Sequence, residues 1–166
     1  MYKVIGFHNP DEGYGFLSNW YLSDFTVDGI TYSSMEQYMM YQKAILFQDE
    51  EIAKEILETT DVGKIKALGR AVKGYKDEVW NGLRQVIIYD GLQQKFFQNE
   101  KLKKQLLDTG NAILAECAVQ DRIWGIGCSM KDERRFNMDE WRGQNLLGFT
   151  LMKVRDKIQK GNIIRE

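Results

Sequence analysis

The chain has 166 residues, of which 43% are hydrophobic and 28% charged, the balance of an ordinary globular protein; we expect one domain, residues 1–166. Its formal net charge of −1 leaves no basic surplus for tight, non-specific nucleic-acid binding. Two cysteines are too few for a disulfide framework, and neither a signal peptide nor a membrane span of ~20 apolar residues is visible, so we expect a cytoplasmic protein without membrane attachment.

Short β regions are predicted at three places in the chain. Residues 2–7 are expected to form a strand. Residues 25–32 are expected to form a hairpin, because Asp28-Gly29 between β-forming residues is a strong two-residue turn signal. Residues 114–119 also have strand character, so the β component is small.

Capping residues and helical periodicity predict helices for most of the remaining chain. Ser33, followed three residues later by Glu36, has the spacing of a capping box and predicts a helix that runs to about Phe47. Further helices are expected at residues 49–57, 61–69, 76–99, 102–107 and 144–160. Helices and strands do not alternate regularly, which disfavours a doubly wound parallel sheet. The sequence therefore predicts a mostly helical α+β single domain with a small β component.

The first predicted helix carries an acid and an amine at helical spacing. Glu36 and Lys43 are seven residues apart, nearly two turns, so both should project from one face, about 10.5 Å apart along the axis. A carboxylate and an amine on one face can flank a ligand. Two structural interpretations stay open, namely Glu36 as a capping-box residue and Lys43 as a solvated surface lysine.

The long predicted helix presents a second candidate face. Steps of four, seven and four residues place Trp80, Arg84, Gly91 and Lys95 on one side. A tryptophan can stack on a base, and basic side chains can hold phosphate. A glycine inside a helix costs up to ~1 kcal/mol relative to alanine, so we expect Gly91 to have a packing or close-approach role. The alternative is a core tryptophan with two basic side chains that reach water.

A later loop combines an acid, an indole and two glycines. Residues 121–127 contain Asp121, Trp124, Gly125 and Gly127. Glycines let a backbone approach a ligand closely and can expose N–H groups to an anion. The pattern is not a dinucleotide-binding fingerprint, and alone it is most often a turn.

Other polar residues have weaker signals. Ser18 and Asn19 offer hydrogen-bonding groups in a loop flanked by aromatic residues, although Asn19 is equally suited to closing a turn on its own backbone. Asn145 has the character of a helix N-cap and Arg155 that of a salt-bridge partner, so we interpret both as structural. His8 is the only histidine and receives no role, and no metal site is predicted.

The ordered set of motifs is more specific than any one of them. In chain order they are Gly15 to Trp20, Phe25 to Tyr32, Ser34 to Tyr38, Gln42 to Ala44, Leu68 to Arg70, Trp80 with Arg84, Lys95-Phe96, Leu106 to Gly110, Leu114 with Glu116, Asp121 with Trp124-Gly125 and Gly127, and Asn145 to Gly148 with Leu151-Met152 and Arg155. Over about residues 13–155, this order resembles the NADAR family, also called YbiA-like.

The resemblance implies a YbiA-like α+β fold and an N-glycosidase or ADP-ribosyl glycohydrolase activity that uses no cofactor and no metal. The implied partner is a small ribose-phosphate or ADP-ribose substrate: a ribosylamino-pyrimidine or ribosylamino-uracil phosphate of riboflavin synthesis, or an ADP-ribosylated guanine base of a nucleic acid. On this basis the predicted catalytic residues are Glu36, Lys43 and Asp121. The predicted substrate-binding residues are Ser18, Asn19, Arg70, Trp80, Arg84, Lys95, Trp124, Gly125 and Gly127.

These residue types suit cleavage of an N-glycosidic bond, which builds positive charge at C1′ and the ring oxygen. Glu36 and Asp121 could stabilise that charge and activate water. Lys43 could donate a proton if burial lowers its pKa, or attack C1′ of a ring-opened sugar to form a Schiff base; both routes stay open. Trp80 and Trp124 would stack on the base or hold the ribose. The phosphate candidates are Arg70, Arg84 and Lys95.

The chain departs from the family pattern on its first helix. Gln37 stands where many members carry histidine, and Met39-Met40 where many have Tyr-Gln. We interpret the methionines as an edge of the pocket that has become apolar, which bears on the substrate base more than on the reaction.

Two other functions are compatible with the sequence. A binding module that recognises ADP-ribose or a nucleotide without cleaving it would need the same pocket but not Lys43 or Glu36. A structural or protein-interaction domain would show no ligand stabilisation and would expose an apolar patch.

Overall fold

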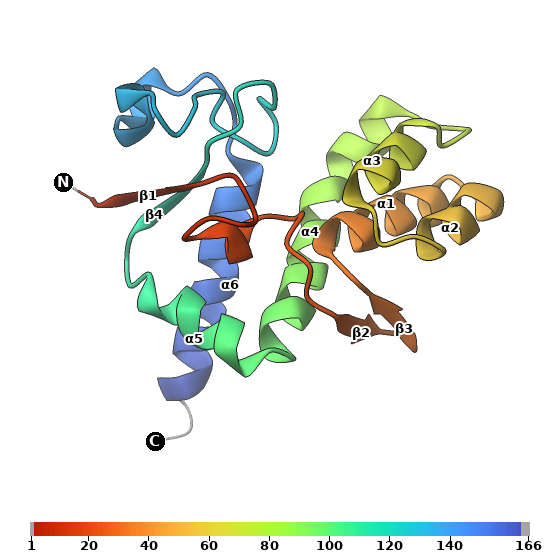
Figure 1. The fold of residues 1–166 in the computed structure, drawn as a ribbon, viewed down its shortest axis with the longest axis horizontal. Helices are drawn as coiled ribbons and strands as arrows, with labels where there is room; N and C mark the ends of the chain where they lie inside the picture. The colour runs from red at the N-terminus through yellow and green to blue at the C-terminus, as the bar shows by residue number, and fades with distance from the viewer. Residues whose placement is uncertain (1, 164–166) are drawn as a thin grey trace. The chain divides into compact units, whose positions relative to one another are not determined.

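The computed structural model describes residues 2–163, and the chain divides into two compact units (Figure 1). Unit 1 consists of Met1–Ser18 with Asn99–Glu166, and unit 2 of Asn19–Gln98. Unit 1 is therefore built from both ends of the chain, and unit 2 from its middle. The described residues are mostly helical with two small two-stranded sheets, which confirms the expected α+β class.

Unit 2 begins with the predicted hairpin. Strands β2 (Phe25–Val27) and β3 (Ile30–Tyr32) pair antiparallel, with Phe25 opposite Tyr32. The two turn residues both have positive φ, 50° at Asp28 and 80° at Gly29. Asparagine, aspartate and glycine tolerate this left-handed region best, and two-residue hairpin turns need it, so the Asp-Gly signal is confirmed.

Four helices follow in unit 2. They are α1 (Met35–Leu46), α2 (Glu50–Leu57), α3 (Val62–Arg70) and α4 (Asp77–Phe97). Helices α2 and α3 both pack on α1, as Figure 1 shows. The predicted caps of α2 and α3 are confirmed, because the side chain of Asp49 accepts from the N–H of Ile52 and that of Asp61 from the N–H of Lys64.

The start of α1 differs by one residue from the prediction. The N-cap is Ser34, not Ser33, and its hydroxyl accepts from the N–H of Gln37 at 3.1 Å. The Gln37 side chain returns the bond by accepting from the N–H of Ser33 at 2.7 Å. Gln37, not Glu36, thus closes the capping arrangement, and the capping-box interpretation of Glu36 is wrong.

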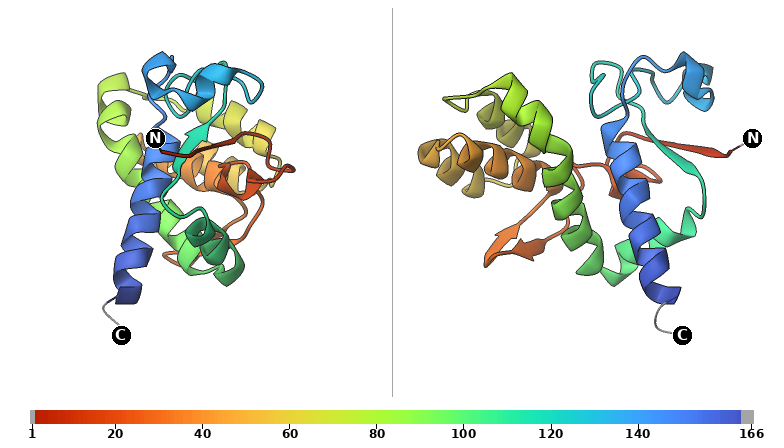
Figure 2. Two further views of the ribbon diagram at one scale, coloured as in Figure 1. Left: turned by 90° about the vertical axis from the view of Figure 1, so that its left-hand side faces the viewer. Right: turned by 180° about the vertical axis from the view of Figure 1, so that it is seen from behind.

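Unit 1 is organised around two strands from opposite ends of the chain. Strands β1 (Val4–Phe7) and β4 (Ile113–Glu116) pair parallel, with Val4 opposite Ile113 and Phe7 opposite Glu116. Helix α6 (Leu146–Ile163) packs on β4 and on α5 (Glu100–Asp108), and Figure 2 shows it from two further directions. The described part of this unit also has three short 3₁₀ helices: η1 (Gly15–Leu17), η2 (Glu133–Phe136) and η3 (Met138–Glu140).

Two residues interpreted as structural have structural roles, and Asn145 stands at the expected N-cap position before α6, where its carbonyl accepts from the Phe149 N–H at 3.1 Å. Asn145 has φ of 52°, and its side chain binds the backbone of β4, donating to the Leu114 carbonyl at 2.8 Å and accepting from the Glu116 N–H at 3.0 Å. Arg155 donates to the Thr109 hydroxyl and the Ala112 carbonyl, both at 2.8 Å, and forms no ion pair with a carboxylate among the described residues. Asn145 thus fastens a strand, and Arg155 fastens the segment that follows α5.

Candidate active site

Lys43 lies on the last turns of α1, with its side chain half-buried and turned toward the end of α3. Its Nζ atom donates a hydrogen bond to the Gly69 carbonyl oxygen at 2.7 Å. The last four carbonyls of a helix have no partner within the helix, and they carry its partial negative charge. A lysine amine is therefore a suitable partner for this carbonyl, and the interpretation of Lys43 as a solvated surface lysine is wrong.

Two aromatic rings border the same amine. Nζ of Lys43 lies 4.5 Å from the ring centroid of Tyr75 and 5.8 Å from that of Trp80. Both distances fall within the range in which a ring face attracts a cation. Trp80 is only 6% exposed and Tyr75 is 40% exposed, so Tyr75 is the ring on the solvent side.

Glu36 lies on the first turn of α1 and is buried. Its backbone N–H donates to the carbonyl oxygen of Asn19 at 2.9 Å, which places Asn19 beside the start of the helix. The charge of Glu36 acts on Lys43 and favours its ammonium form. The expectation that the two side chains share one face of α1 is therefore supported.

Burial dominates the electrostatics of Lys43. It lowers the pKa of the amine, since the charged form loses hydration. Arg70, at the end of α3, lowers it further by like-charge repulsion, while Glu36 and Asp77 raise it. The result is a pKa below the ordinary lysine value, which increases the share of neutral amine near neutral pH.

Arg84, from the middle of α4, is buried and only partly satisfied. Its Nη1 donates to the Asn81 side chain at 2.8 Å, whereas its Nε has no hydrogen-bond partner in the described part of the chain. The side-chain oxygen of Asn19 is likewise buried without a partner there. Unmade hydrogen bonds on buried groups cost about 1–3 kcal/mol each, so such groups call for a functional or structural reason.

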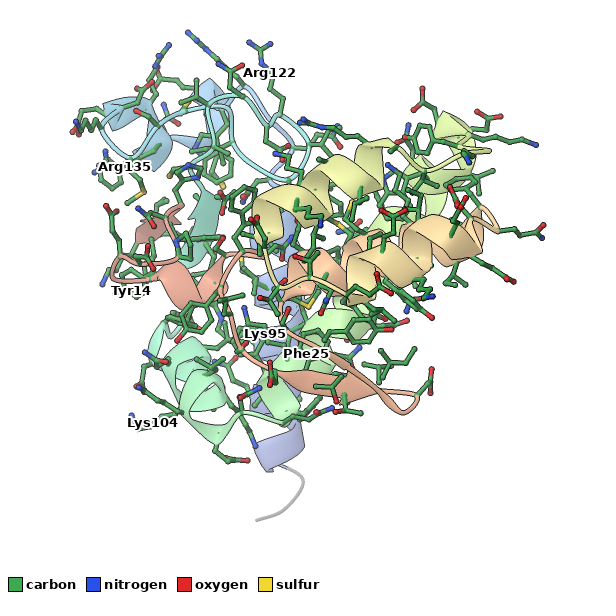
Figure 3. The ribbon with its side chains drawn as sticks, turned by 45° about the vertical axis from the view of Figure 1, so that its right-hand side comes forward. Tyr14, Phe25, Lys95, Lys104, Arg122 and Arg135 are labelled. Carbon is green, nitrogen blue, oxygen red and sulfur yellow. The ribbon has the colours of Figure 1, made fainter. Side chains whose placement is uncertain are left out.

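The predicted face of α4 is buried along its whole length. Trp80, Arg84, Gly91 and Lys95 are all buried, and Lys95, labelled in Figure 3, is 0% exposed. Burial lowers the pKa of Lys95 to about 7. The expected packing role of Gly91 is confirmed, because a Cβ there would lie 2.5 Å from ring atoms of Tyr38.

Unit 1 holds the Asp-Trp-Gly segment, and its backbone is packed tightly. Asp121 accepts at one carboxylate oxygen from the N–H groups of Ile123 and Trp124, at 2.9 and 2.8 Å, which closes a turn. A Cβ at Gly125 would meet the Asp121 and Glu116 carbonyls at 2.8 and 2.9 Å. These contacts give the turn a structural reason, and a role of Asp121 in substrate chemistry stays a prediction.

The remaining predicted residues are placed as follows. Trp124 is half-buried, and Gly127 has φ of 70°. Ser18 is buried at the end of η1, where its N–H donates to the Gly15 carbonyl at 2.9 Å. Arg70 is exposed. Substrate contacts of all four stay predictions.

His8, to which the sequence assigned no role, has a buried partner. Its Nδ1 lies 3.0 Å from Oε1 of Glu116, while Oε2 of Glu116 is buried without a partner among the described residues. The hydrogen bond to Glu116 raises the pKa of His8, and burial raises the pKa of Glu116. The pairing joins residues far apart in sequence, so no local pattern could have revealed it.

The departures from the family pattern lie in the core. Gln37 is buried and donates to the carbonyls of Ile56 and Thr59 at 3.0 and 2.9 Å, which ties α1 to the end of α2. Met39 and Met40 are also buried. Met40 packs against Gly69 of α3, and the interpretation of the two methionines as an apolar edge of the pocket stays a prediction.

Tyr75 is the residue that the sequence analysis missed beside Lys43. It lies in the short loop between α3 and α4, where no periodic pattern marks a residue as buried or functional. In the sequence, Gly74 directly before the tyrosine was the one sign that the chain turns at this point. In the described residues, no group of three or more His, Cys, Asp or Glu side chains is arranged to hold a metal ion, and no helix is long and apolar enough to cross a membrane.

Comparisons with known proteins agree with these observations. The profile of the NADAR domain family matches residues 6–159. An N-glycosidase of Acanthamoeba polyphaga mimivirus is 37% identical over an alignment of 166 residues, and the alignment covers 95% of this chain and 98% of that one. A riboflavin biosynthesis protein of Vibrio vulnificus (strain YJ016) is 32% identical over 160 residues, 96% of this chain but 40% of that protein.

A solved structure with a similar fold supports the same family. The NMR structure of the Escherichia coli protein YbiA matches with a TM-score of 0.81 and 27% identity, covering 97% of this chain and 88% of that one. The expected YbiA-like fold is therefore confirmed. Since the family profile spans residues of both units and most of the chain, this protein belongs to the NADAR domain family.

Proposed function

We propose that this protein is an N-glycosidase that hydrolyses the bond between C1′ of a ribosyl group and a nitrogen of its base, with Lys43 and Glu36 as the reacting pair. The observation that carries the proposal is the half-buried Lys43 amine, which is hydrogen-bonded to the Gly69 carbonyl and has a lowered pKa, on the same helix as the buried Glu36. The mimivirus relative and the Escherichia coli relative YbiA are both named N-glycosidases, which supports this reaction.

In the first route Lys43 is a general acid. Its ammonium donates a proton to the nitrogen of the departing base, while the carboxylate of Glu36 stabilises the positive charge that develops at C1′. Water then adds to C1′ and loses a proton, which restores the ammonium. A lowered pKa helps here because an ammonium ion with a lower pKa is a stronger proton donor.

In the second route the neutral amine of Lys43 is the nucleophile. It attacks C1′ of the ring-opened glycosylamine and expels the base nitrogen, so one C–N bond forms as the other breaks. Water then hydrolyses the Lys43 imine and releases the sugar aldehyde, and one water is consumed overall. The lowered pKa of Lys43 supports this route as well, since only the neutral amine attacks.

The substrate is proposed to be a ribosylamino-pyrimidine or ribosylamino-uracil phosphate, or an ADP-ribosylated guanine. The name of the Vibrio vulnificus relative supports the riboflavin-related compound, although this chain spans only 40% of that relative. Arg70 and Arg84 are the proposed phosphate ligands, and Asn19 would orient the sugar or base. The unmade hydrogen bonds of Arg84 and Asn19 support these roles. A cytoplasmic location stays a prediction.

Incubation with both substrates, followed by chromatography of the free base, tests the proposal. We expect base release by the unmodified protein and none by Lys43→Met, with Lys64→Met as the matched control because Lys64 is exposed on the neighbouring helix α3. A shift in melting temperature without any free base would show binding alone and overturn the enzymatic proposal. Unchanged turnover in Lys43→Met would remove Lys43 from the reaction.

Borohydride trapping separates the two routes. If Lys43 forms an imine, reduction during turnover attaches the sugar to the Lys43 peptide, which mass spectrometry detects. If turnover proceeds and no such adduct forms, the general-acid route is the one that operates.

A further inference from the structure

The loop between α3 and α4 is fastened to the start of α2. The N–H of Lys73 donates to Oδ2 of Asp49 at 2.9 Å, while Oδ1 of the same carboxylate accepts from the N–H of Ile52 at 3.2 Å. Asp49 is buried, and these hydrogen bonds lower its pKa, so the carboxylate is charged near neutral pH. One side chain therefore caps a helix and fixes a loop.

The fastened loop presents Tyr75. Gly74 has φ of 73°, a left-handed conformation that turns the chain just before the tyrosine. The ring of Tyr75 packs edge-on against Phe47, the residue that follows α1, with centroids 5.3 Å apart. Burial and the charge of the Asp77 carboxylate raise the pKa of its hydroxyl.

The position of the ring determines what surrounds the Lys43 amine. Nζ lies 4.5 Å from the Tyr75 centroid, 5.8 Å from the Trp80 centroid and 2.7 Å from the Gly69 carbonyl oxygen. A lysine side chain has four rotatable bonds and loses up to ~2 kcal/mol of rotamer entropy when it is fixed. The two rings and one carbonyl border the half-buried amine and restrict those rotations.

We propose that Tyr75 is a positioning residue for Lys43, carried over the amine by a loop that Asp49 ties to α2. The inference rests on the proposed function, in which Lys43 reacts at C1′ or at the leaving nitrogen. Tyr75 acts through Lys43, and its ring face, not its hydroxyl, does the positioning. A displacement of a reacting group by about 1 Å can cost ~100-fold in rate, so loss of the ring should lower kcat.

The first test is a spectroscopic signature that does not depend on activity. Protons above an aromatic face are shifted upfield, so the ε-CH2 of Lys43 should resonate upfield of the other lysines in spectra of the ¹³C-lysine-labelled protein, with Lys43→Met providing the assignment. We expect Tyr75→Phe to keep the shift and Tyr75→Leu to reduce it strongly. An unshifted Lys43 signal in the unmodified protein, or a full shift in Tyr75→Leu, would overturn the proposal.

The second test is kinetic. We expect Tyr75→Leu to lower kcat about 10- to 100-fold with KM within about twofold, and Tyr75→Phe to restore kcat to within about twofold of the unmodified protein. Phe97→Leu is the matched control, because Phe97 is another exposed ring of unit 2, 43% exposed against 40% for Tyr75. Equal kcat in Tyr75→Leu and Tyr75→Phe would show that the ring does not position Lys43.

The tether is tested by a pair of capping aspartates. Asp49→Asn keeps an oxygen for the helix cap but replaces the acceptor of the Lys73 N–H, whereas Asp61→Asn alters a cap that accepts from the Lys64 N–H on its own helix. We expect Asp49→Asn to lower kcat and the upfield shift, and Asp61→Asn to change neither. If Asp49→Asn leaves both unchanged, the tether has no part in the positioning.

The proposal and the proposed function fail in different ways. If the unmodified protein releases no base from either substrate while the Lys43 signal is shifted upfield, the N-glycosidase proposal fails. The placement of the Tyr75 ring over the Lys43 amine is then correct but has no role in catalysis. If base is released and the Tyr75 variants leave kcat unchanged, only the positioning role fails. Because Tyr75 is partly exposed, both of its variants should fold, and thermal melting checks this.

Discussion

The Nζ atom of Lys43 donates a hydrogen bond to the carbonyl oxygen of Gly69, 2.7 Å away, and this bond joins the end of α1 to the end of α3. Glycine at position 69 lets α3 pack closely on α1, because a Cβ there would collide with the Met40 side chain. The same amine is half-buried beside two aromatic rings and has a lowered pKa. Lys43 thus completes a helix terminus while burial keeps the pKa of its amine below the ordinary lysine value.

Glu36→Gln should separate the charge of this residue from its shape. The amide keeps the volume of the side chain but cannot stabilise positive charge at C1′, so we expect kcat/KM to fall about 100-fold or more with an unchanged circular dichroism spectrum. Glu50→Gln is the control, because Glu50 also lies in the first turn of a helix but is exposed. Full activity in Glu36→Gln would exclude its carboxylate from the reaction, and loss of folding would indicate a structural role.

Asp121→Asn should test the second predicted carboxylate without opening its turn. Asparagine keeps an oxygen that can accept from the N–H groups of Ile123 and Trp124, so the melting temperature should change little. If Asp121 activates water, kcat should fall about 100-fold. A variant with normal kcat and normal stability would leave Asp121 with the turn as its function.

Gly91→Ala and Gly82→Ala should have opposite effects on stability, although both lie on α4. A Cβ at Gly91 would lie 2.5 Å from Tyr38 ring atoms and 2.8 Å from Cε of Met35, whereas a Cβ at Gly82 meets nothing within 4 Å. We expect the free energy of unfolding to fall by about 1–3 kcal/mol for Gly91→Ala and to rise by up to ~1 kcal/mol for Gly82→Ala. Urea denaturation measures both, and a stabilised Gly91→Ala would contradict the packing.

The only histidine gives a direct pH readout. The hydrogen bond that His8 donates to the Glu116 carboxylate raises the pKa of His8, so its imidazole should titrate above 6.5 by NMR and at lower pH in Glu116→Gln. Because the folded-state pKa is raised, the His8 contribution to stability is complete below about pH 6.5 and is lost as pH rises through the folded value. An imidazole pKa that is unchanged in Glu116→Gln would show that the pair does not form.

The sequence alone determined the parts of this protein that depend on neighbouring residues. The Asp28-Gly29 turn needs only two residues that accept positive φ, and the caps at Asp49 and Asp61 need only a side-chain oxygen beside the first N–H groups of a helix. The shared face of Glu36 and Lys43 follows from helical spacing in the same way. Ser33 and Ser34 are equivalent by type, so the sequence missed the cap of α1 by one residue.

Tertiary structure decided what each side chain meets. The parallel pairing of β1 with β4, the bond from His8 to Glu116 and the anchoring of β4 by Asn145 join residues that no local pattern relates. The lowered pKa of Lys43 arises from burial, and burial requires α3 and the Tyr75 loop to pack on α1, so spacing along one helix could not reveal it. Local geometry is set by short-range sterics and hydrogen bonds, whereas the chemistry of the amine is set by what the folded chain places around it.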